Sequence, residues 1–156
     1  MGIFLTSWPQ VLEAITGILE NAFADVQFAD QPLAVQVYPR LVISPTGPTI
    51  DMYPADPARE EESGGFGDIS GGVNFVIRAR VGTADTDGAQ ELLMAFMDDT
   101  DELNVIAPLF ADPTLGGVAW SFGLQGPTGF SFYPAADGSG AFLGCQWTIT
   151  VLIAHS

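Results

Sequence analysis

In this chain of 156 residues, three side-chain types that often act as nucleophile or base are scarce: histidine and cysteine occur once each, and lysine is absent. The one histidine, His155, is the penultimate residue, and chain ends fray, so neither a Ser–His–Asp nor a Cys–His pair is expected. The absence of lysine excludes Schiff-base chemistry and the Walker phosphate-binding motif. The single cysteine, Cys145, lies in the apolar run FLGCQWTITVLIA, which predicts a buried, inert thiol. We therefore expect a protein that is not an enzyme and needs no cofactor.

Carboxylates are abundant, but their spacing selects no metal or catalytic site. The segment DTDG, from Asp85 to Gly88, begins like a calcium loop and lacks the third acidic ligand and the closing glutamate. A second cluster, at an expected junction between two helices, also suits the positive N-terminal end of the following helix; it comprises Asp98, Asp99, Asp101 and Glu102. No pair among the nineteen Asp and Glu residues is singled out for glycoside hydrolysis.

The glycine-rich run SGGFGDISGG does not match a phosphate-binding loop, because Ser70 stands at the third glycine position of GxGxxG. It belongs to a long, acidic, Gly-rich loop expected at about 55–72, and loops of that length are usually disordered or functional. The loop includes Glu60, Glu61 and Glu62, which are either a solvated charge run or a functional feature.

The charge balance limits the classes of partner. Nineteen acidic residues oppose four arginines, which gives a formal net charge of −15. Affinity for nucleic acid depends largely on Lys and Arg, so the chain is not expected to hold DNA, RNA or an anionic membrane surface. Solubility is the simplest explanation of the acidity. The arginines are Arg40, Arg59, Arg78 and Arg80.

An aromatic set on the expected C-terminal strands leaves two interpretations open. Such residues can line a sugar-binding face, although packing in the core or at a subunit interface is the commoner role of aromatic side chains on strands. The set comprises Trp120, Phe122, Phe130, Phe132, Tyr133 and Trp147.

The elements that must position these residues begin with an amphipathic helix. Ser7 is the expected N-cap, Pro9 suits the first turn, and the helix is expected to end near Asp25. Its apolar face recurs at helical spacing and comprises Val11, Leu12, Ile15, Ile18, Leu19, Ala22 and Phe23.

Extended segments follow at 33–40 and 49–55, where Pro39 and Pro54 indicate strand ends or an edge strand. The clearest strand is 73–82, in which Val73, Phe75, Ile77, Ala79 and Val81 alternate with Asn74, Arg78 and Arg80 on the other side.

Helices are expected at 89–99 and 101–111, the first with an apolar stripe of Ala89, Leu92, Leu93, Phe96 and Met97. Strands are expected at 118–124, 129–134 and 141–154, the last in a central position with a tight turn at 136–140 before it. A crossover around 73–124 then packs two helices on one face of a mixed sheet. The prediction is a single α/β (α+β) domain over 1–156, with a mixed, mostly antiparallel sheet and an N-terminal helix.

The opening MGIFLTSWPQ has no basic leader, and no apolar span is long enough to cross a bilayer. With one cysteine, no intrachain disulfide can form. These features predict folding in a reducing cytoplasm without membrane contact.

At VNFVIRARVGTADTDGAQELLMAFMDD the chain resembles the tail-terminator, or tail-completion, proteins of long-tailed, non-contractile phages of actinobacteria and similar hosts. The resemblance continues through VIAPLFADPTLGG, where that family has a short helix, an acidic-Pro turn and paired glycines before a strand. The order of elements is also similar, with proline-bearing strands as in VYPRLVISPTGPTIDMYPADP and an aromatic closing strand, CQWTITVLIA. It spans most of the chain, and ADPTLGG is its most specific part.

The resemblance implies an α/β subunit of a ring, expected to be a homohexamer, in the neck of the virion. Such a ring caps the tail tube, stops its polymerisation and joins it to the head connector, so its partners are itself, the tube protein and the connector. DNA passes through without tight binding, and assembly takes place in the host cytoplasm. Our hypothesis is that Glu60, Glu61, Glu62 and Asp68 face the lumen or the neighbouring tube ring. Candidate interface residues are Phe66, Tyr53 and Arg59.

Two other interpretations remain open. The nearest is another neck component, such as a head-completion or stopper protein, or a tail-tube subunit. The other belongs to a different class and is a small carbohydrate-binding module that uses the strand aromatics.

Overall fold

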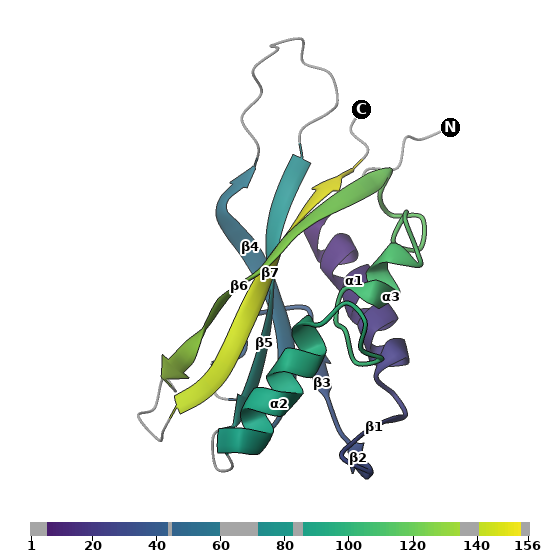
Figure 1. Ribbon diagram of the computed structural model, residues 1–156. Coiled ribbons are helices and arrows are strands. Elements are labelled where there is room, and N and C mark those ends of the chain that lie inside the picture. The colour runs from purple at the N-terminus through teal and green to yellow at the C-terminus, as the bar shows by residue number, and fades with distance from the viewer. Residues whose placement is uncertain (1–5, 44, 60–71, 83–85, 135–140, 154–156) are drawn as a thin grey trace, which may run out of the picture.

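The computed structural model describes residues 6–43, 45–59, 72–82, 86–134 and 141–153 (Figure 1). A five-stranded sheet has the order β3-β4-β5-β7-β6, and β1 and β2 form a separate two-stranded hairpin. The strands are β1 (Val26–Phe28), β2 (Gln31–Leu33), β3 (Gln36–Tyr38), β4 (Thr49–Arg59), β5 (Gly72–Gly82), β6 (Ser121–Pro134) and β7 (Ala141–Leu152). The helices are α1 (Trp8–Ala22), α2 (Thr86–Met97) and α3 (Ala107–Phe110).

The sheet is mixed and mostly antiparallel, as predicted. Among the described strands, only β3 and β4 are parallel neighbours, whereas β4–β5, β5–β7 and β7–β6 are antiparallel pairs. Strands β5 and β6 therefore run in the same direction with β7 between them, and the chain passes from one to the other through α2 and α3. This is the crossover predicted around 73–124, and β7 lies centrally, with a partner on each side.

Helix α1 begins as the sequence predicts. The Ser7 hydroxyl accepts a hydrogen bond from the Gln10 amide at 3.3 Å, and the Gln10 side chain accepts one from the Ser7 amide at 2.7 Å, which completes a capping box. Pro9 lies in the first turn, where no intrahelical donor is lost. The helix ends at Ala22, earlier than the predicted Asp25, and Phe23 turns into the core as its C-cap residue.

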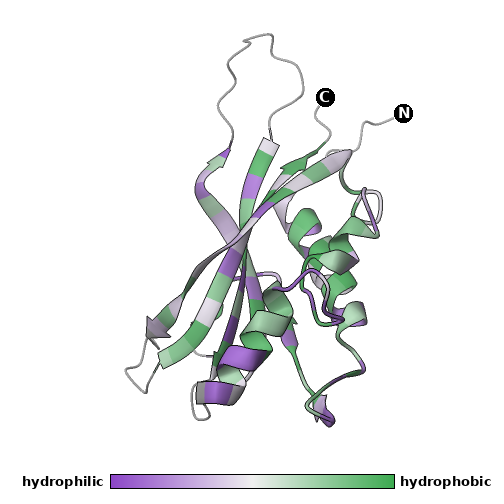
Figure 2. Ribbon diagram, in the orientation of Figure 1, coloured by the Kyte–Doolittle hydropathy of each residue, from purple (hydrophilic) through white to green (hydrophobic). Residues whose placement is uncertain are grey.

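All three helices lie on the same side of the sheet (Figure 1). From α1, Trp8 packs edge-on against Phe75 of β5 with 5.9 Å between ring centroids, and Phe23 meets Phe96 of α2 at 5.8 Å. One apolar core results, with Phe75, Phe96 and Trp147 among its largest fully buried side chains. Figure 2 shows hydrophobic residues concentrated on α1, bands of both kinds along the central strands, and hydrophilic residues at the start of α2.

The loop predicted at 55–72 is shorter than expected. Strand β4 continues to Arg59 and β5 begins at Gly72, so residues 55–59 and 72 belong to strands. Pro54 therefore lies inside β4 and does not end it. The reason is that β3 pairs only with Thr49–Asp51, and the register between β4 and β5 shifts directly after Pro54. A proline without a donor is tolerated where the ladder is already interrupted.

Other boundaries also differ from the predictions. The strands expected at 118–124 and 129–134 are one strand, β6, which carries one extra residue relative to β7 both between Gln125 and Thr128 and between Thr128 and Ser131. These bulges, with Gly126 and Gly129 at positive φ, let the strand pass Pro127 without a break. The helix predicted at 101–111 is reduced to α3, and the strand predicted at 33–40 is divided between β2 and β3. The hairpin β1–β2 was not predicted.

Candidate functional site

The face of the sheet that bears no described helix carries a buried charge network. Arg78 and Arg80 point away from the apolar face, as predicted, but they are covered instead of solvated. Arg78 forms two hydrogen bonds with the carboxylate of Asp51, from Nε at 3.0 Å and from Nη2 at 2.6 Å. Nη2 of Arg80 contacts the same carboxylate at 3.0 Å. The carboxylate of Asp51 is fully buried, so two cations share one desolvated anion.

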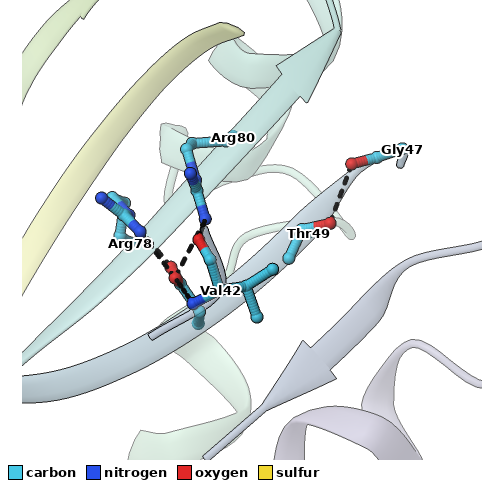
Figure 3. A network of polar contacts seen from close by, with 6 residues as sticks. Val42, Gly47, Thr49, Arg78 and Arg80 are labelled. Atoms are coloured by element: carbon cyan, nitrogen blue, oxygen red, sulfur yellow. Dashed lines mark hydrogen bonds and ion pairs between the residues drawn. The ribbon is translucent and has the colours of Figure 1, made fainter. Parts of the chain in front are cut away.

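The same network holds one residue, Val42, of the segment 39–43 and 45–48, which we call the strap. The amide of Val42 donates to Oδ2 of Asp51 at 2.8 Å, and the carbonyl of Val42 accepts from Nη2 of Arg80 at 2.6 Å. Figure 3 shows Arg78 and Arg80 directed toward Val42 and the carboxylate beside it, with dashed lines for the bonds between them. The strap thus crosses the helix-free face and is held by charge-assisted hydrogen bonds at its centre.

Burial and charge act in opposite directions on the two guanidinium groups. Burial lowers the pKa of Arg78, but the hydrogen bond and the charge of Asp51 outweigh it and leave that pKa raised. For Arg80 burial prevails, and its pKa is lowered although Asp51 lies beside it. Nε of Arg80 is also buried without a hydrogen-bond partner among the described residues. Arg80 is therefore the more costly of the two cations to bury.

A second surface feature lies along β6, which forms one edge of the sheet. Among the described residues β6 pairs with β7 alone. Large apolar side chains at or near this strand face solvent, with Trp120 and Phe110 each 56% exposed and Phe132 61% exposed. Phe110 of α3 stacks on the half-buried Phe122 with 5.7 Å between ring centroids. We call Phe110, Trp120 and Phe122 the aromatic patch; Phe130 and Phe132 lie toward the other end of the strand.

The predicted aromatic set does not form one face. Trp147 is fully buried in the core, so it cannot contact a ligand at the surface. The hydroxyl of Tyr133 donates to the carbonyl of Gly129 at 2.8 Å, and its ring lies over Gly144, where an added Cβ would approach Cδ1 of the ring to 3.0 Å. Trp120, Phe130 and Phe132 are the exposed members of the set.

Two acidic residues after α2, Asp98 and Asp101, accept local hydrogen bonds. Oδ1 of Asp98 accepts from the amide and the hydroxyl of Thr100, and these bonds lower the pKa of Asp98. Oδ1 of Asp101 accepts from the amide of Leu103 at 2.8 Å. Across the described ranges, no group of three or more His, Cys, Asp or Glu side chains could hold a metal ion. In the same part of the chain, no helix is long and apolar enough to cross a membrane.

The predicted inert thiol is confirmed. Cys145 is fully buried in β7, and burial raises its pKa to about 12. Asp85, of the DTDG segment, lies outside the described residues.

Most of the predicted contact residues cannot be placed. Glu60, Glu61, Glu62, Asp68 and Phe66 lie outside the described residues. Of the other two, Tyr53 is half-buried beneath the guanidinium of Arg78, 5.2 Å from the ring centroid, and Arg59 is exposed at the end of β4.

The central residue of the network, Asp51, was not predicted. One signal was present, because a lone carboxylate in the apolar strand TIDMY needs a cation, and Arg78 and Arg80 are two residues apart on one side of a strand.

Comparison of the sequence with protein-family models and with curated proteins finds no match in either.

Proposed function

We propose that this protein is a ring-forming tail terminator that caps a phage tail tube, stops its polymerisation and joins it to the head connector. The observation that carries the proposal is the edge strand β6, 14 residues long, with exposed aromatic side chains beside it. An open strand edge and large exposed apolar side chains are the features by which chains associate. The proposal thus assigns this surface to contacts between subunits, with no bond-making chemistry.

The distribution of arginine supports a passage through which DNA moves without being held. Arg78 and Arg80 are neutralised within the network around Asp51, which leaves Arg40 and Arg59 at the described surface. Because tight binding to DNA requires many phosphate contacts from Lys and Arg, a ring of such subunits would bind the genome weakly. The formal net charge of −15 acts in the same direction.

Deleting the gene from the phage that carries it, followed by electron microscopy of the particles, tests the proposal. Loss of a terminator should give abnormally long tubes. Separate heads and full-length tails would instead identify a head-completion or stopper protein, and the absence of any tube would identify a tube subunit. Absence of the protein from purified virions would contradict all three.

The carbohydrate-binding alternative depends on the exposed aromatics, above all Trp120. A sugar stacked on this indole would change its fluorescence, so titration with oligosaccharides distinguishes the two interpretations. Under the proposed function no sugar should shift the emission of the wild-type protein.

A further inference from the structure

We propose that the strap is one half of the contact between neighbouring copies of this chain, and that the aromatic patch of the next copy is the other half. In this contact Leu41 and Ile43 pack against Phe110 and Trp120. The inference rests on the proposed function, because it names the surfaces through which the ring would close.

The strap presents two aliphatic side chains from a fixed backbone. Val42 is hydrogen-bonded through both its amide and its carbonyl to the buried network. Its neighbours Leu41 and Ile43 are 52% and 64% exposed. A surface segment normally loses conformational entropy when it binds, and a segment that is already held loses less. Two exposed aliphatic residues on either side of a fixed residue are therefore suited to contact a partner.

The strap and the aromatic patch lie on opposite faces of the sheet. Phe122 is paired in register with the core residue Val151 and stacks on Phe110 of α3, which places the patch on the helix side. The strap is bonded to Arg80, which lies on the opposite face from the core residue Ala79. Two different surfaces that face opposite ways produce a head-to-tail contact, and such contacts close into rings when the rotation between copies permits.

The cation beside the strap is opposite in sign to the exposed charges on the helices. Arg40, one of the two exposed arginines, directly precedes Leu41. The exposed carboxylates of Glu13, Glu20 and Glu91 lie on the helices, the side that bears the aromatic patch. In the proposed contact, Arg40 of one copy would therefore approach a side of the next copy that carries exposed carboxylates, which favours pairing of the two different surfaces.

Cysteine crosslinking tests the arrangement, because the native Cys145 is buried and its thiol is protonated at neutral pH. The double variant Ile43→Cys/Phe110→Cys, treated with a short bismaleimide, should give a ladder of covalent species up to the full ring. Each single variant should give no ladder. A mixture of the two single variants should stop at dimers, because each chain then has only one reactive end.

The matched control is Ile43→Cys/Phe130→Cys, whose aromatic position lies outside the patch and should not crosslink. The experiment uses the purified protein. If that protein elutes as a monomer, purified particles that carry the variants are used instead.

Trp120 reports on the same contact without a crosslinker. Transfer of its indole from water to an interface should shift its emission to shorter wavelength as copies associate, and Ile43→Asp should abolish the shift while the unfolding midpoint remains unchanged. A ring that assembles without the Ile43–Phe110 ladder would overturn this inference and leave the proposed function intact. Efficient dimers from Ile43→Cys alone would overturn the head-to-tail arrangement. If no oligomer forms in solution or in particles, the proposed function itself fails.

Discussion

Arg80, a buried residue of β5, donates a 2.6 Å hydrogen bond to the carbonyl oxygen of Val42, a residue of a surface segment. The same Nη2 atom contacts Asp51, which in turn accepts a hydrogen bond from the amide of Val42. The backbone of one surface residue is therefore attached at two points to a buried ion network. This arrangement links the stability of the fold to the position of the surface that we assign to subunit contact.

Replacing Asp51 with asparagine should destabilise the protein strongly. Asparagine fills the same space but leaves Arg78 and Arg80 without a counter-charge, and loss of one partner from a buried ion pair costs about 3–5 kcal/mol. Urea-induced unfolding measures the change in free energy. Hydrogen exchange at the amide of Val42 should accelerate in parallel, because its acceptor is weakened.

Asp99→Asn is the matched control, since Asp99 is exposed in the turn after α2. Its free energy of unfolding should remain within about 0.5 kcal/mol of the wild type. Equal effects of the two substitutions would show that the network contributes no specific stability.

Gly144→Ala should also destabilise the fold. An added Cβ would lie 2.8 Å from the carbonyl oxygen of Ala79, closer than such atoms approach in folded proteins, and 3.0 Å from the ring of Tyr133, which is also a tight contact. Overpacking of this kind costs about 1–3 kcal/mol. Gly123→Ala, on the adjacent strand β6, has no atom within 4 Å of the added Cβ and should change the free energy of unfolding much less. If both variants unfold at the same denaturant concentration, the close packing of Tyr133 over Gly144 is not important.

Local sequence patterns predict much of the fold, because many helices and strands are determined by interactions between residues that are close in sequence. The capping box at Ser7 and the alternation from Val73 to Val81 depend on residues that are close in sequence, and both are confirmed. The continuity of β6 was missed, because Gly126 and Pro127 indicate a turn when read alone. Pairing with the whole length of β7 outweighs that local signal, and only the three-dimensional partner reveals it.

The candidate site was harder to predict for the same reason. Asp51 and Arg80 are 29 residues apart, and only the pairing of β4 with β5 brings them together. The alternation of β5 correctly places the arginines away from the apolar face, but it cannot show that the strap covers them. The exposure of Phe110 and Trp120 is likewise unpredictable, since an aromatic residue on an expected strand or helix is more often buried.

The thiol of Cys145 should react only when the protein unfolds. Burial raises its pKa from 9.0 to about 12, so at pH 8 the folded protein presents almost no thiolate. Labelling with a chromogenic disulfide reagent should be slow in buffer and rapid in urea, whereas an exposed cysteine introduced by Ser131→Cys should react at once. Rapid labelling of native Cys145 would show that β7 opens readily.

The same shift predicts how stability responds to alkaline pH. Above pH 9 the unfolded chain releases the Cys145 proton while the folded chain retains it, so the unfolded state binds fewer protons. This contribution to stability is fully present below pH 9 and declines as the pH rises toward 12. The decline in the free energy of unfolding over this range should be shallower in Cys145→Ala, although that variant is less stable at neutral pH because it leaves a cavity.

Reversing the charge of the acidic loop should impair the passage or joining that the proposed function requires. Glu60 and Glu61 follow directly after Arg59, at the end of β4. Changing both to lysine should strengthen binding of double-stranded DNA and steepen its dependence on salt, because each added cation can neutralise a phosphate. In the phage, the same variant should reduce infectivity through defective DNA ejection or tail joining. The control is Asp25→Lys/Asp30→Lys, which changes the net charge by the same amount at the β1–β2 hairpin. Unaltered infectivity of the Glu60→Lys/Glu61→Lys phage, with normal tails and full ejection, would show that this loop faces neither the lumen nor the tube.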